Sequence, residues 1–303
     1  MQENAQQPQK NPWLGVVYIV VSALFYSLMS LFVRLAGDLP VFQKSFFRNL
    51  VAAFVGLGIL IKSRSLKMQK GSLPSLLARS VAGTVGILCN FYAIDRMNIS
   101  DASILNKLAP FFSIVFSVFL LREKASVKDW VLVAVAFSGA LFVVKPSFDF
   151  NKSLPAALGV LGGLGAGLAY TFVRKLGKRG ERNAMIVFFF STFSCLAMLP
   201  FVIWQYEPMT WAQLGFLLLA GCAASGAQLS VTAAYTYAPA KEISVYDYSQ
   251  VLFAAIWGAC FLGEFPDWFS VLGYVIIIGA AIFKAVFAHK EKLVKTKEER
   301  GQV

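Results

Sequence analysis

The sequence predicts an all-α integral membrane protein in which ten transmembrane helices form two inverted five-helix repeats around a central cavity. The first observation is composition: the 303 residues are 57% hydrophobic and 15% charged, whereas about a quarter of the residues in a soluble domain are charged. The second is that the charges cluster between apolar runs of about 20 residues, the length that crosses the hydrocarbon core of a bilayer. The third is a pattern that returns after about 140 residues.

The apolar runs define ten expected helices joined by short loops. The runs do not alternate in polarity, as the strands of a membrane barrel would. A polar leader covers residues 1–12, and a basic, solvated tail covers residues 289–303. The expected spans are 13–33, 41–61, 75–94, 101–121, 127–144, 155–173, 184–204, 211–234, 242–262 and 268–288.

Basic residues set the expected orientation of these helices. They gather after the second, fourth, sixth and tenth spans, and the alternate loops are nearly bare of them. Because basic loops stay in the cytoplasm, both termini should be cytoplasmic, in a plasma membrane of the bacterial inner or cell membrane type. The clustered residues are Lys62, Arg64, Lys67, Lys70, Arg122, Lys124, Lys128, Arg174, Lys175, Lys178, Arg179, Arg182, Lys290, Lys292, Lys295, Lys297 and Arg300.

The repeat is clearest in residues 101–130, where Lys107 and Pro110 interrupt an apolar run. A stretch that begins at Lys241 matches it without a gap when Glu123 is placed on Glu264, an offset of 141 residues (264 − 123). Five spans is an odd number, so the second copy must enter the membrane from the opposite side. Inverted repeats are frequent in secondary transporters, whose substrates bind near the midplane between the halves. The two expected repeats are residues 13–145 and 155–288.

The same run also resembles a motif of the drug/metabolite transporter superfamily, in its EamA-type branch. The motif A-x-x-x-x-K-L-x-P, closed by L-x-E, is met by Ala102, Lys107, Leu108, Pro110, Leu121 and Glu123; the second copy keeps Leu262 and Glu264 but has Ile243 and Val251 at the small and proline positions. An early arginine in FFRNLVAA, Arg48, also fits the branch. The resemblance implies a basket-like ten-helix fold, a central cavity and alternating access for small metabolites, often in efflux. It implies no single substrate, since members carry amino acids, nucleotide-related compounds, organic cations and drugs.

Three charges inside apolar spans are candidate substrate-binding residues, because a charge at the centre of a membrane helix costs about 2.5–3.5 kcal/mol on insertion scales. Lys107 either faces the cavity or extends outward to the interface. Asp247 either binds a cation, couples a proton or closes an inner gate, or else forms a structural ion pair with Lys241 or an arginine. Arg48 either binds a carboxylate or phosphate or pairs with a nearby backbone group. Pro110 removes a backbone hydrogen bond and should kink the fourth span, which exposes carbonyls to water or substrate.

Neutral polar residues in the spans are further candidates for the cavity. Asn106 and Tyr248 flank the charged positions, and the alternative for a buried tyrosine is that it only finds a hydrogen-bond partner in packing. Glu123 and Glu264 mark the ends of spans, where they cap or orient helices. The remaining polar candidates are Asn90, Tyr92, Tyr26, Tyr170 and Gln228.

Glycines at four-residue spacing in the sixth span place small residues on one face, which lets another helix approach closely. They are Gly159, Gly163 and Gly167.

Several function classes are disfavoured by what the sequence lacks. The single histidine, His289, lies in the tail, and the four cysteines are isolated, so we expect no catalytic residue, no metal site and no cofactor. The net charge of +12 is explained by the loops, so we expect no nucleic-acid partner. No phosphate-binding GxxxxGK[ST] motif is present, so we do not expect a primary, ATP-driven pump. The expected partners are membrane lipids and a small-molecule substrate, with a proton as a coupling ion and a homodimer left open.

These observations favour a secondary transporter for a small polar or amphipathic metabolite. Arg48 and Lys107 could bind a carboxylate and Asp247 an amine, which suits an amino-acid-like zwitterion. The alternative within the same class is an organic-cation or drug transporter that uses Asp247 and neighbouring aromatic rings. A non-transporting membrane sensor or scaffold is the third hypothesis.

Overall fold

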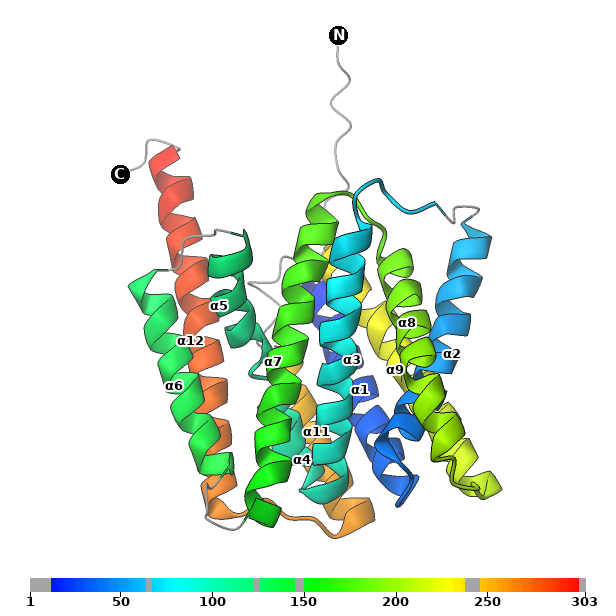
Figure 1. Ribbon diagram of the computed structural model, residues 1–303. Helices are drawn as coiled ribbons and strands as arrows, with labels where there is room; N and C mark the ends of the chain where they lie inside the picture. Colours follow the sequence, from blue (N-terminus) through cyan, green and yellow to red (C-terminus); the bar gives the residue numbers. More distant parts are fainter. Residues whose placement is uncertain (1–11, 64–66, 122–125, 145–149, 238–245, 300–303) are drawn as a thin grey trace.

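The computed structural model describes residues 12–63, 67–121, 126–144, 150–237 and 246–299 (Figure 1). Within these ranges every regular element is a helix. The elements are α1 (Pro12–Leu35), α2 (Val41–Lys62), α3 (Leu73–Arg96), α4 (Ile99–Asn106), α5 (Ala109–Leu121), α6 (Val127–Val144), α7 (Phe150–Lys178), α8 (Asn183–Trp204), α9 (Trp211–Tyr237), the 3₁₀ turn η1 (Tyr246–Tyr248), α11 (Ser249–Trp257), the π-helical η2 (Gly258–Leu262) and α12 (Trp268–Glu299).

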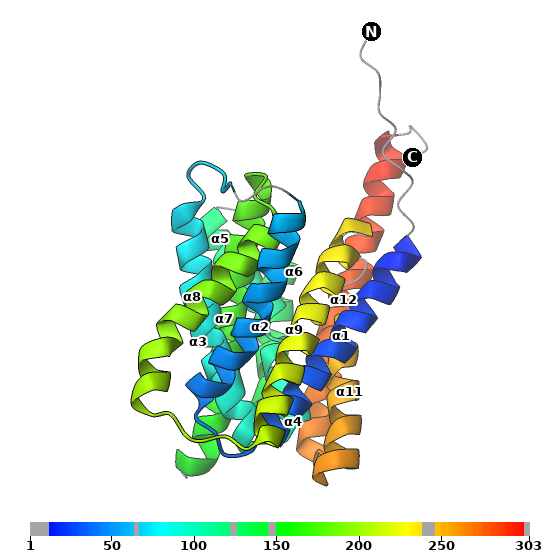
Figure 2. The same ribbon diagram turned by 90° about the vertical axis from the view of Figure 1, so that its right-hand side faces the viewer.

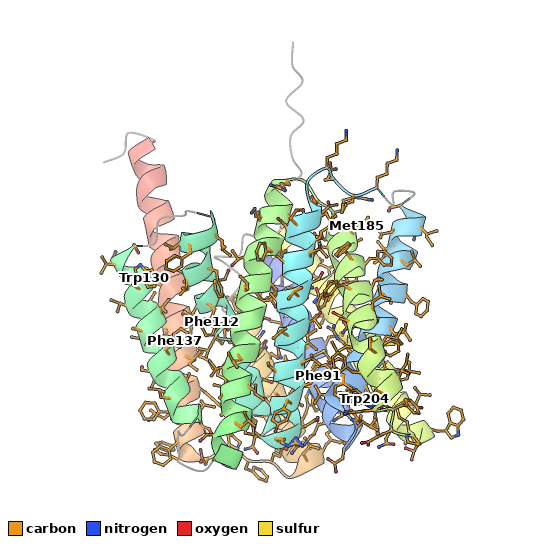
Figure 3. The ribbon with its side chains drawn as sticks, viewed as in Figure 1. Phe91, Phe112, Trp130, Phe137, Met185 and Trp204 are labelled. Carbon is orange, nitrogen blue, oxygen red and sulfur yellow. The ribbon has the colours of Figure 1, made fainter. Side chains whose placement is uncertain are left out.

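The lengths and surfaces of these helices fit a lipid bilayer. Seven described segments are long and apolar enough to cross a membrane, and Trp130–Val143 and Trp268–Phe283 form shorter apolar helices. Large apolar side chains lie on the outside of the bundle, among them Trp130 and Trp204 (Figure 3). A soluble monomer rarely exposes apolar patches of this extent, so the chain is a membrane protein.

The helices form a bundle in which neighbours are often distant in sequence. α3 packs along α7, α1 along α9, α2 against α8, and α6 against α12. α6 and α12 form one edge of the bundle, and α2 and α8 form the other (Figure 1). α1 begins at the end of the bundle where α12 ends (Figure 2).

Two half-length helices, α4 and α11, lie at the centre of this arrangement. One apolar cluster joins α4, α5, α6, α11 and α12, and includes Phe111 and Ile277. A second joins α1, α3, α4, α9 and α11 around Phe91 (Figure 3). Because α4 and α11 contribute to both clusters, they connect the two sides of the bundle.

The expected span over residues 101–121 is present as one candidate membrane-crossing segment, Ile99–Leu120. The structure divides it into two helices, with Lys107 and Leu108 between them. Pro110 lies in the first turn of α5, where a proline is tolerated since the amide hydrogens of that turn have no intrahelical partner. In place of the predicted kink at Pro110, the helix is broken just before this residue, at Lys107 and Leu108.

Two other expected boundaries differ from the structure. The expected span over 242–262 starts in residues outside the described ranges and continues as η1, α11 and η2. α12 continues to Glu299, so part of the expected solvated tail is helical.

Candidate substrate-binding site

The break between α4 and α5 frees a backbone carbonyl in the middle of the bundle. In a continuous helix the Lys107 carbonyl would accept the amide hydrogen of Phe111, but that amide bonds to the Leu108 carbonyl at 2.9 Å. The hydroxyl of Tyr248 donates to the Lys107 carbonyl instead, at 3.1 Å. Since a bare carbonyl in an apolar interior costs several kcal/mol, Tyr248 stabilises the break.

The side chain of Lys107 extends to the same segment. Its Nζ lies 2.5 Å from Oδ2 of Asp247, in η1. The two side chains are 10% and 24% exposed, so the pair is largely but not fully shielded. Lys107 therefore does not extend to the membrane surface, and Asp247 pairs with Lys107, a partner that is neither Lys241 nor an arginine. Lys241 itself lies outside the described residues.

Glycines of α7 allow this helix to press directly on the break. A Cβ on Gly163 would lie 2.7 Å from the Leu105 carbonyl oxygen, and a Cβ on Gly167 would lie 2.7 Å from that of Ala109. Real Cβ atoms do not approach oxygen so closely, so only glycine fits at these positions. The close helix approach predicted from the four-residue spacing is confirmed.

Arg48 lies in α2 and is 3% exposed. Its Nη1 donates to the side-chain oxygen of Asn49 at 2.6 Å, and Asn49 in turn donates to the Ser45 carbonyl at 2.9 Å. The Nε atom has no hydrogen-bond partner among the described residues. Arg48 thus has a neutral partner and an unused donor.

A second buried arginine, Arg79 of α3, was missed in the sequence. It is 6% exposed, and its guanidinium carbon lies 3.6 Å from the centre of the Phe190 ring. Within the described part of the chain its Nε and Nη1 have no hydrogen-bond partner. The signal that could have found it is the one used for Arg48, because Arg79 also lies inside an expected span.

Two tyrosines connect these charges. Tyr26 of α1 and Tyr170 of α7 are within electrostatic range of each other, of both arginines and of Asp247. Half of the surface of Tyr170 is accessible. The structure therefore brings Arg48, Tyr170, Lys107, Asp247 and Tyr248 into one region.

The remaining predicted residues make no hydrogen bond to these groups in the described part of the chain. Asn106 ends α4, and Asn90 lies on α3 beside Gly162 of α7. The side-chain oxygen of Asn90 is buried and has no partner among the described residues. Gln228 is half-buried on α9. None of the described residues forms a group of three or more metal-ligating side chains.

A polar network was also missed, at the end of the bundle where α4 begins. The carboxylate of Glu264 accepts from Arg34 Nη2 at 2.9 Å and from the Ile99 amide at 2.9 Å, which caps α4. Arg34 also donates to the Ile94 carbonyl at 2.7 Å. The predicted capping role of Glu264 is confirmed, whereas Glu123 lies outside the described residues.

Other buried charges at this end are paired as well. Lys44 Nζ lies 2.6 Å from the carboxylate of Asp95, and the Tyr274 hydroxyl donates to Asp101 at 2.6 Å. In Figure 2, α1 and α2 lie close together near α4 and are further apart at the other end of the bundle.

Comparison with known proteins gives a consistent result. The sequence pattern of the EamA-like transporter family matches residues 13–145 and again residues 154–285. The pseudopaline exporter CntI of Pseudomonas aeruginosa is 32% identical over 271 residues, which cover 88% of this chain and 94% of the exporter.

More distant proteins share most of the length. The S-adenosylmethionine uptake transporter of Rickettsia prowazekii is 23% identical, with 94% of this chain and 96% of that protein covered. Solute carrier family 35 member G1 of Mus musculus is 26% identical, with 88% of this chain and 77% of the carrier covered. A crystal structure at 13% identity has a TM-score of 0.64 and covers 91% of this chain and 98% of that chain, so the fold is shared.

Proposed function

The chain belongs to the EamA-like transporter family, and from that premise we propose that it is a secondary transporter for a small polar or amphipathic metabolite, with an amino-acid-like zwitterion favoured. Like its relatives, the chain is a membrane transporter and not an enzyme. The proposed route is alternating access across the plasma membrane, with both termini in the cytoplasm. Export is favoured, because the relative at 32% identity is an exporter.

The proposed architecture is ten spans in two inverted five-helix repeats around a central cavity. Two successive matches to one family pattern support it. The packing supports it too: exchanging the repeats turns the α3–α7 contact into the α9–α1 contact, and it maps the α2–α8, α6–α12 and α4–α11 contacts onto themselves.

The observation that carries the proposal is a contact between the break in the first repeat and a 3₁₀ turn at the equivalent position of the second. The break at Lys107 and Leu108 corresponds, at the offset of 141 residues, to Tyr248 and Ser249, where the 3₁₀ turn η1 passes into α11. Non-helical backbone at membrane depth is tolerated where it lines a cavity or is buried in protein, and paired interruptions mark substrate sites in inverted-repeat transporters. Here the break and the η1 turn contact each other directly, through the Lys107–Asp247 ion pair and through the Tyr248 hydroxyl, which donates to the Lys107 carbonyl.

This ion pair suits a zwitterionic substrate because the substrate can replace both partners at once. A substrate carboxylate would pair with Lys107 and a substrate ammonium group would pair with Asp247. Neither of the two protein charges would then lack a partner. A substrate with one charge would leave the other unpaired, at a cost of about 3–5 kcal/mol for a buried pair. We infer that opening the pair is the step that couples binding to the change of access.

The contacts at one end of the bundle indicate which side of the protein is closed. The Arg34–Glu264 network joins α1, α3 and α4 to the segment after η2. This end lies opposite the end where α1 begins (Figure 1), so the positive-inside rule makes it the outer end. We propose that the structure is the inward-facing state with its outer gate closed.

The organic-cation alternative needs a free carboxylate at Asp247. That carboxylate already holds Lys107 at 2.5 Å, so a cation would have to displace the lysine and leave it unpaired. Proton coupling and a homodimer remain predictions. An imposed pH gradient tests the first through its effect on uptake, and cross-linking in the membrane tests the second.

The experiment is counter-flow in proteoliposomes. Liposomes that contain the purified chain are loaded with an unlabelled metabolite, and entry of the same labelled compound is followed with and without internal substrate. We expect saturable entry that internal substrate accelerates, first among amino acids. Ligand binding without flux would favour the hypothesis of a non-transporting membrane sensor or scaffold. Flux that internal substrate does not accelerate would contradict alternating access.

A further inference from the structure

Two buried arginines near the proposed substrate site have no acidic partner in the described part of the chain. Arg48 has a neutral asparagine at Nη1 and a free Nε, and Arg79 has an aromatic ring and two unpartnered nitrogens. Both lie against α8: Arg79 stacks on Phe190, and the part of α2 that carries Arg48 contacts the same helix, where Cys195 Sγ lies 3.6 Å from the Phe46 carbonyl. Unsatisfied buried donors of charged groups are costly, so their presence requires a reason.

Three other cations in the described part of the chain are paired with acids. Arg34 has Glu264, Lys44 has Asp95, and Lys107 has Asp247, at 2.9, 2.6 and 2.5 Å. Arg48 and Arg79 depart from this pattern, although both are more than nine-tenths buried. A purely structural arginine in a membrane bundle would be expected to have an acid or a full set of carbonyls around it.

The surroundings of Arg79 hold its guanidinium in place without neutralising it. A Cβ on Gly83, one turn further along α3, would lie 2.9 Å from the Phe190 ring and 3.2 Å from Arg79 Nη1. The absence of a side chain at Gly83 therefore makes room for the ring and the guanidinium to stack. A planar cation fixed on a ring, with its donors unused, is suited to bind a carboxylate.

The charges of the region do not balance. Among the described residues, Lys107 has one acidic partner, Asp247, and Arg48 and Arg79 have none. Tyr26 and Tyr170 add only neutral hydroxyls within electrostatic range. We infer that Arg48 and Arg79 form an anion site, and that the substrate is a net-anionic amino acid with at least one carboxylate beyond the one that pairs with Lys107. This inference rests on the proposed transport function and narrows its substrate class.

The test is binding of four related probes to the purified chain: 2-oxoglutarate, L-glutamate, L-glutamine and L-lysine. They share a similar carbon skeleton and run from dianion through monoanion and neutral zwitterion to cation. Binding is measured as the rise in melting temperature with concentration. We expect L-glutamate to stabilise the protein at concentrations at least about tenfold below those of the other three probes. Glutamine and lysine lack the second carboxylate, and 2-oxoglutarate lacks the ammonium group that would pair with Asp247.

Variants separate an anion site from a structural role. R79Q should weaken glutamate binding roughly ten- to a hundredfold and remove the preference over glutamine, and R79K should restore part of both. The matched control is R96Q, because Arg96 is on the same helix and also stacks on a ring, that of Tyr92, but is exposed. A structural role predicts that R79Q lowers the melting temperature and leaves the charge preference unchanged.

Equal shifts for all four probes, no shift for any of them, or a preference for lysine would overturn the inference. Counter-flow keeps this failure distinct from failure of the proposed function. Accelerated exchange without a preference for anions would retain the transporter and remove the anion site. Absence of exchange for every amino acid and carboxylate tested would remove the proposed function.

Discussion

The Lys107–Asp247 ion pair should couple the two halves of the protein energetically. At 2.5 Å and an effective dielectric constant of about 20, the gross attraction is about 6–7 kcal/mol, and desolvation of the two groups offsets most of it. K107M leaves a partly buried carboxylate alone, and D247N leaves a partly buried ammonium alone. Each single variant should therefore lose about 2–4 kcal/mol of stability.

The double variant K107M/D247N removes both charges together. It should be less destabilised than the sum of the single variants by about 1–3 kcal/mol, because no charge is left without a partner. Thermal unfolding of the four proteins in one detergent measures this interaction. The control cycle combines K107M with E207Q, an exposed residue in the loop between α8 and α9, for which we expect additive effects.

Two results would refute this reasoning. If the effects of K107M and D247N add to within about 0.5 kcal/mol, the two groups are not coupled as their distance implies. If the double variant regains transport together with stability, the pair is a structural contact and not the substrate site.

Further predictions concern the break, the helix seam and the outer end. G163A should lower the melting temperature through about 1–3 kcal/mol of overpacking, whereas G177A on the same helix, whose Cβ meets nothing within 4 Å, should not. P110A restores an amide hydrogen and should favour a continuous helix, which lowers the transport rate while the protein still folds; unchanged transport would contradict a role for the break. Y248F should cost about 0.5–1.5 kcal/mol in thermal unfolding, and a cost near zero would show that the freed carbonyl finds another donor. E264Q should weaken the outer closure, and cysteine labelling from the outer side should become faster; slower labelling would place the gate elsewhere.

The helices could be predicted from the sequence because a lipid-exposed chain must satisfy every backbone group within each span. The same reasoning identified Lys107, Asp247 and Arg48, since a charge in a span is costly unless it has a partner or a function. Arg79 met the same criterion, and the predictions did not include it.

The contacts themselves could not be predicted from one sequence. Pro110 indicates an interruption nearby, but the position of the break depends on which carbonyl finds a new donor, and that donor, Tyr248, lies 141 residues away. The partner of Asp247 was expected among nearby basic residues, whereas it comes from the other repeat. Such pairings follow from how the two halves pack, which local patterns do not encode.

The most direct test is counter-flow of labelled L-glutamate in proteoliposomes with the wild-type chain and with K107M/D247N. We expect internal glutamate to accelerate entry in the wild type, and we expect this exchange to be lost in the double variant although the protein remains folded. Exchange at the wild-type rate in the double variant would contradict a substrate site formed by the break and the η1 turn.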